Sequence, residues 1–166
     1  MTLLTESDGV EFQEYLARLR EERQRADVVR IALEWERTPY IHQGRIKYQA
    51  ADCTFFAAVY QEAGLLDPGL VIPPYSHQAH LNRQGSAYLP IVERCARREI
   101  TQAEALPGDI VMWFLARSWS HGAVIIEPGF PFIIHADMAA GMVCRGEGDN
   151  GVFLTAPRRF FSWWGP

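Results

Sequence analysis

The sequence of 166 residues has no long apolar run, no excess of basic residues and no closely spaced pair of cysteines. A helix that spans a bilayer needs about 20 consecutive apolar residues, and no stretch approaches that length. The 16 Lys and Arg residues against 20 Asp and Glu residues give a net charge of -4, which excludes a nucleic acid as the main partner because such binding depends on a basic surface. The absence of a Cys-x-x-Cys motif argues against a structural zinc site and against thioredoxin-like redox chemistry.

The N-terminus lacks the basic start and the apolar core of a secretory signal, because Glu6 and Asp8 follow almost at once. We therefore expect the protein to be cytoplasmic as synthesised. Three cysteines cannot all pair within one chain, so a reduced compartment and at least one free thiol are expected. The reactivity of each thiol then depends on its surroundings.

Apolar residues make up 48% of the chain, which is enough for one hydrophobic core and predicts a single domain. Helical spacing and capping residues predict four helices in the N-terminal part. They are expected at about residues 9–24, with Asp8 in a capping box and Phe12, Tyr15, Leu16 and Leu19 as one face, and at about residues 27–38, 52–64 and 86–98. The segment 67–86 is rich in Pro, Gly, His and Asn, and we expect it to form a surface flap or part of a cleft wall.

After Pro107 the sequence changes to short β-rich runs separated by turn residues. Strands are expected at residues 110–115, 123–126, 132–136, 142–144, 152–154 and 160–164. Helices followed by strands predict an α+β domain in which an antiparallel sheet packs on the helical half. The final run also contains Trp163 and Trp164, for which burial in the sheet is favoured over an exposed docking patch.

Cys53 is expected in the first turn of a helix, with Asp52 as the cap. The positive end of a helix dipole favours the thiolate, which is the nucleophilic form of cysteine. Cys95 and Cys144 lie on an apolar helix face and in a short strand, where a small buried side chain is the simpler interpretation. Taken alone, Cys53 also favours that structural interpretation.

His121 and His135 lie on two strands joined by a turn, so that their rings can lie side by side across the ladder. A thiol, a base and a third group that orients the base are the parts that nucleophilic catalysis needs. On the pattern alone, a role for both histidines as satisfied core residues stays open. His77 and His80 lack a third ligand and indicate polar surface, so we expect no metal site and no cofactor.

Five short motifs in order resemble those of the NlpC/P60 cysteine peptidases and together span roughly residues 28–136. They are Thr38-Pro39-Tyr40, Ala51-Asp52-Cys53-Thr54, Leu106-Pro107-Gly108-Asp109-Ile110-Val111, Ser120-His121-Gly122-Ala123 and Ile133-Ile134-His135-Ala136. The segments 35–52 and 59–65 are especially similar to the phage-type branch of the family. That branch is encoded in tail modules of phages, prophages and gene transfer agents.

The resemblance implies a papain-like α+β fold, in which the helix of the nucleophile packs on an antiparallel sheet. It implies one catalytic domain over residues 1–166, with residues 1–26 as a helical extension. Cys53 would be the nucleophile, His121 the general base and then acid, and His135 the orienting residue. The backbone N–H of Cys53 would stabilise the oxyanion. The substrate pocket would be lined by Tyr40, Asp52 and Ser120.

Family members cleave peptide stems of the bacterial cell wall. The resemblance therefore implies a phage- or prophage-derived thiol protease that hydrolyses peptidoglycan stems through an acyl-enzyme. Phage tail or virion proteins would be further partners, and the location would be virion-associated. The usual Asp-Cys-Ser-Gly is here Asp52-Cys53-Thr54-Phe55, which leaves the substrate preference open. Two alternatives remain: an acyltransferase or deamidase with the same Cys–His pair, and a catalytically idle structural protein of a tail assembly.

Overall fold

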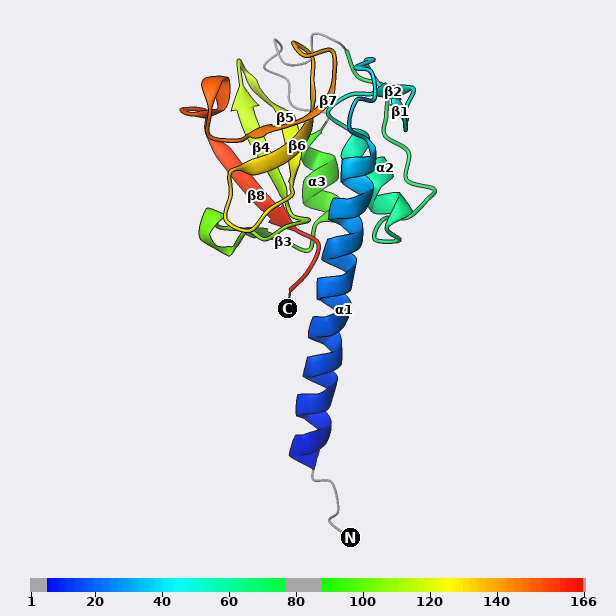
Figure 1. Cartoon of the computed structure of the whole chain (residues 1–166), viewed down its shortest axis with the longest axis vertical. Coiled ribbons are helices and arrows are strands. Elements are labelled where there is room, and N and C mark those ends of the chain that lie inside the picture. The colour runs from blue at the N-terminus through cyan, green and yellow to red at the C-terminus, as the bar shows by residue number, and fades with distance from the viewer. Residues whose placement is uncertain (1–5, 77–87, 166) are drawn as a thin grey trace.

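The computed structural model describes residues 6–76 and 88–165 and shows an α+β architecture (Figure 1). His77, His80 and Ser86, where the fourth helix was expected to begin, lie outside these residues. Among the described residues, no helix combines the length and the apolar character that crossing a membrane requires.

A six-stranded antiparallel sheet forms the C-terminal half of the chain, with the strand order β3-β8-β4-β5-β6-β7. Its strands are β3 (Arg98–Ile100), β4 (Ile110–Leu115), β5 (Ser118–Ile125), β6 (Phe132–Asp137), β7 (Met142–Glu147) and β8 (Arg158–Ser162). The expected α+β fold with an antiparallel sheet is confirmed. The expected strand at 152–154 is wrong, because Asn150 and Gly151 begin the 3-10 turn η3 (Gly151–Phe153), in which Gly151 has a φ of 54°.

Three α-helices precede or flank the sheet: α1 (Glu6–Glu34), α2 (Phe55–Glu62) and α3 (Leu89–Cys95). The two helices expected at 9–24 and 27–38 form the single helix α1, because no proline and no glycine after Gly9 interrupts it. The N-terminal half of α1 projects away from the body (Figure 1), and Phe12 and Leu19, which were expected on one apolar face, are exposed. The fourth expected helix is shorter than predicted, because the chain enters β3 at Arg98.

The core lies on both faces of the sheet. The helices cover one face, where Trp35, Phe55 and Trp163 belong to the larger cluster of buried side chains. The other face carries a smaller cluster that includes Trp113 and Ile133. Trp163 and Trp164 are both buried, as favoured from the sequence, but they follow the end of β8 and do not lie in the closing strand. Trp163 stacks on Tyr60 with ring centroids 4.1 Å apart.

Alternation along β6 decides on which face each side chain lies. Ile134 and Ala136 belong to the cluster beneath the helices, whereas Ile133 belongs to the cluster on the opposite face. His135 has the same parity as Ile133 and contacts Phe153, which packs on that second cluster.

A two-stranded sheet of β1 (Arg45–Ile46) and β2 (Ala50–Ala51) lies between α1 and Cys53. Ala51 donates its N–H to the carbonyl of Pro39 at 2.9 Å and accepts the N–H of Ile41 at 2.9 Å. These bonds hold Tyr40 next to the chain that leads into Cys53.

Candidate active site

A row of three side chains joins the turn before α2 to the sheet. Cys53 Sγ lies 3.3 Å from His121 Nδ1, although 68 positions separate the two residues. His121 Nε2 lies 2.9 Å from His135 Nδ1. The structure therefore brings together the three residues that the sequence singled out.

The rings of the two histidines lie side by side across β5 and β6, as expected, although the two residues are not direct partners in the strand pairing. The pairing of β5 with β6 places Val124 opposite Ile134 and Ile125 opposite Ile133. His135 directly follows this paired stretch, and His121 precedes it by three positions. Their rings meet at a centroid distance of 5.1 Å with planes inclined by 82°, an edge-to-face arrangement that suits a hydrogen bond between ring nitrogens.

Asp52 organises the turn that presents Cys53. Its Oδ1 accepts hydrogen bonds from the Thr54 N–H at 2.9 Å and the Thr54 hydroxyl at 2.7 Å, and its Oδ2 accepts the Gln43 N–H at 2.6 Å. The expectation that Asp52 caps the helix with Cys53 in its first turn is wrong: Thr54 occupies the cap position before Phe55, and Cys53 lies in the preceding turn. Asp52 fixes that turn through its side chain.

Burial governs the protonation of the thiol. It raises the pKa of Cys53 to about 12, and the negative charge of Asp52 adds to this effect. Hydrogen bonds from the backbone of Gly122 and of Cys53 itself oppose it only in part. Burial therefore opposes the thiolate that was expected at Cys53.

The neighbouring imidazole is neutral as well. Burial lowers the pKa of His121 to about 3, with His135 as the second cause, and burial also lowers the pKa of His135. A neutral thiol beside a neutral imidazole is ready to transfer its proton when an electrophile arrives, rather than to hold a permanent ion pair.

Aromatic side chains fix the orientation of the His121 ring. Phe153 stacks on it, with centroids 5.1 Å apart and planes inclined by 25°, and Trp113 lies 5.8 Å away. Gly122, the next residue on β5, leaves space for the ring of Tyr88, because a Cβ at this position would overlap that ring. The sequence did not indicate Phe153, since residues 152–154 were expected to form a strand.

The row opens into a pocket of about 440 Å³. Its lining includes Cys53, His121, His135, Tyr40, Asp52, Ser120, His42, Thr54, Tyr75, Ser76, Asp137, Val152 and Phe153. The described part of the segment 67–86 contributes Tyr75 and Ser76, which confirms that segment as part of a cleft wall. The Tyr75 hydroxyl donates to Asp52 Oδ2 and lies 3.2 Å from the Thr54 hydroxyl, a contact that no sequence motif indicated.

Two hydroxyl groups that line the pocket, those of Tyr40 and Ser120, differ in how freely they can donate a hydrogen bond to a substrate. Burial, together with the negative charge of Asp52, raises the pKa of Tyr40, so its hydroxyl stays protonated and can donate. The Ser120 hydroxyl lies 3.5 Å from the carbonyl of Leu115 and donates to it weakly. Cys95 and Cys144 were expected to be buried, but both are half-buried free thiols.

Comparison of the sequence with protein-family models and with curated proteins finds no match. Comparison of the structure finds the NlpC/P60 domain of the peptidoglycan hydrolase SagA, at 21% identity and a TM-score of 0.54, over 81% of this chain and 96% of that one. It also finds NlpC2 and NlpC1 from Trichomonas vaginalis. NlpC2 is 12% identical with a TM-score of 0.56, and 84% of this chain matches 46% of it. NlpC1 is 15% identical with a TM-score of 0.54, and 84% of this chain matches 44% of it.

This chain thus spans less than half the length of the two Trichomonas proteins. What the three structures share with it is the arrangement of helices on an antiparallel sheet. The chain has the papain-like α+β fold of NlpC/P60 domains, and it carries a Cys-His-His row within that fold.

Proposed function

We propose that the protein is a cysteine peptidase that hydrolyses the peptide stems of bacterial peptidoglycan. One observation carries the proposal: a thiol, an imidazole and a second imidazole stand in hydrogen-bonding order at the wall of an open pocket. That order is the one in which a nucleophile, its base and the orienting group of the base must stand. The stem-peptide substrate is supported by the fold shared with the hydrolase SagA.

In the proposed mechanism His121 Nδ1 accepts the proton of the Cys53 thiol while Sγ attacks the scissile carbonyl carbon. His121 Nε2–H donates to His135 Nδ1 throughout, which stabilises the imidazolium that forms. The proton then passes from His121 to the leaving amine as the C–N bond breaks, leaving an acyl-enzyme. A water molecule gives a proton to His121, attacks the thioester, and releases the acid and the Cys53 thiol.

The rim residues are assigned by position around that reaction. The Tyr40 hydroxyl and the backbone N–H of Cys53 would donate to the carbonyl oxygen, and Ser120 lines the substrate pocket. Asp52 holds the turn that contains Cys53 through its hydrogen bonds and lines one side of the pocket. The row needs no cofactor for this reaction.

The phage-type motifs in segments 35–52 and 59–65 support a finer proposal, that the chain comes from a phage or prophage tail module and works within a virion. Mass analysis of isolated virions from a host carrying the gene tests this proposal. Detection of the chain in purified particles is expected. A chain found only in the cell lysate would contradict a virion role and leave the peptidase proposal in place.

Digestion of purified cell-wall sacculi, with mass analysis of the soluble fragments, tests the function. New peptide fragments with one free amine for each cleaved bond are expected. Incorporation of an added amine into the product instead of water would show an acyltransferase. Intact sacculi after prolonged incubation with folded protein would contradict the proposal and favour an idle structural domain.

A further inference from the structure

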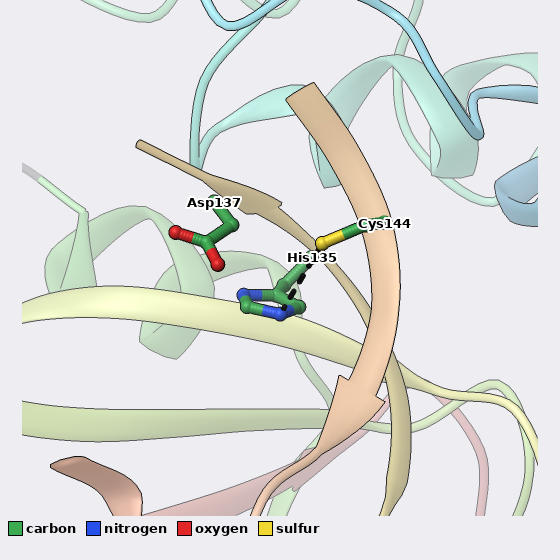
Figure 2. A group of neighbouring side chains, drawn as sticks. All are labelled: His135, Asp137 and Cys144. Atoms are coloured by element: carbon green, nitrogen blue, oxygen red, sulfur yellow. Dashed lines mark hydrogen bonds between the residues drawn. The ribbon is translucent and has the colours of Figure 1, made fainter. Parts of the chain in front are cut away.

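A second set of donor atoms lies behind the Cys-His-His row. It consists of His135, Asp137 and Cys144 (Figure 2). One ring nitrogen, one carboxylate oxygen and the sulfur lie within 4.8 Å of one another. Cys144 Sγ is 3.9 Å from His135 Nε2, the nitrogen that His121 does not use. Imidazole, thiolate and carboxylate are the ligands that Zn²⁺ takes in proteins.

The strand register explains why these three side chains converge. Residues 135 and 144 are direct partners across β6 and β7, so both side chains lie on one face of the sheet. Asp137 follows His135 by two positions on β6 and therefore points to the same face. β7 is an edge strand, and Cys144 and Asp137 are only half-buried, so a cation can reach them from solvent.

The distances fit a tetrahedral ion after small side-chain movements. Zn–S and Zn–N bonds of ordinary length place sulfur and nitrogen about 3.6 Å apart, close to the 3.9 Å between Cys144 and His135. Asp137 Oδ1 accepts the Ala139 N–H at 2.8 Å, which restrains the carboxylate, and one of its oxygens lies within 4.8 Å of the other two donor atoms. Gly146 leaves space beside the ring, since a Cβ there would lie 3.0 Å from His135 Nε2.

We propose that His135 Nε2, Cys144 Sγ and the Asp137 carboxylate form a site for Zn²⁺ or a similar soft divalent cation, and that its occupation switches off the neighbouring Cys–His pair. Binding the cation removes the thiol proton of Cys144 to solvent. A water molecule completes the four ligands. Binding does not depend on the proposed function, whereas the inhibition does.

The switch works through the tautomers of the two rings. While His121 acts as base, its proton is on Nε2, His135 Nδ1 accepts it, and His135 Nε2 carries its own hydrogen. A cation on Nε2 moves that hydrogen to Nδ1, which now donates to His121 Nε2. The hydrogen of His121 then resides on Nδ1, facing Cys53, so His121 cannot accept the thiol proton. Neither ring gains or loses a proton in total.

Binding is tested in the Cys53→Ala protein, which removes the other thiol near the rings. Titration with Co²⁺ should give a thiolate-to-metal absorption band and a stoichiometry of one. The band should vanish in Cys53→Ala/Cys144→Ala and persist in the matched control Cys53→Ala/Cys95→Ala. A band that survives loss of Cys144, or no binding at all, would overturn the site. The Asp137→Asn change in the same background should weaken binding at least tenfold without unfolding the protein.

Inhibition is tested on sacculi with the full chain. With a chelator present, Cys144→Ala should match the wild type, because Cys144 takes no part in the reaction. With Zn²⁺ added, the wild type should lose activity at concentrations that leave Cys144→Ala active, a shift of at least tenfold. Equal sensitivity of both proteins would refute the switch. If neither protein hydrolyses sacculi in chelator while Co²⁺ still binds through Cys144, the proposed function fails and the metal site stands.

Discussion

The neutral state of His121 makes the stability of the fold depend on pH. Burial lowers its pKa from 6.5 to about 3, so the unfolded chain binds a proton between these values that the folded chain does not. The stabilisation from the neutral ring is complete above pH 6.5 and is lost as the pH falls towards 3. At pH 5 the free energy of unfolding is therefore lower by about 2 kcal/mol than at pH 7 from this group alone.

Removing the imidazole isolates that contribution. Chemical denaturation of the wild type and of His121→Gln at pH 7 and pH 5 measures it, because the variant lacks the titrating ring and should lose about 2 kcal/mol less over the same interval. Ser120→Ala, a change at the adjacent position on β5, is the control and should follow the wild-type profile. Equal losses in the wild type and in His121→Gln would refute the argument that His121 is held neutral by burial.

Three further predictions concern the same site. Phe153→Ala should lower kcat/KM for stem-peptide hydrolysis about 2- to 10-fold by freeing the His121 ring, in line with about 0.5–1.5 kcal/mol for an aromatic contact, while thermal unfolding shows the fold retained. Gly122→Ala should destabilise the protein by about 1–3 kcal/mol in urea unfolding, because its Cβ overlaps the Tyr88 ring. Because burial raises the pKa of Cys53, its alkylation by iodoacetamide at pH 7 should be no faster than that of Cys95 and should accelerate with rising pH; rapid labelling at pH 7 would contradict this.

Local patterns predicted much of the secondary structure. The strand at 110–115 coincides with β4, and the helix that follows Asp52 ends before Gly64, which has a φ of 71°. The patterns failed where the secondary structure depends on pairing with a segment that is distant in the sequence. β3 exists because Arg98, Glu99 and Ile100 pair with β8 across about 60 residues of chain, and three residues carry too little periodicity to reveal such a pairing.

The candidate site was predictable in its members but not in its surroundings. Cys53, His121 and His135 could be named from the sequence because chemically distinctive residues stood in a recognisable order. Tyr75 and Phe153 could not, since their roles come from packing against residues 21 or more positions away. The protonation of Cys53 was also out of reach, because it depends on how completely the folded chain removes water from the sulfur.

The dependence of sacculus hydrolysis on Cys53 and His121 tests the central claim most directly. Initial rates of peptide release are to be compared for the wild type, Cys53→Ala, His121→Ala and the control Cys95→Ala, each with its fold checked by circular dichroism. The account predicts a loss of at least about 10³-fold in the first two variants and a rate near that of the wild type in the control. Substantial release of peptides by folded Cys53→Ala would contradict it.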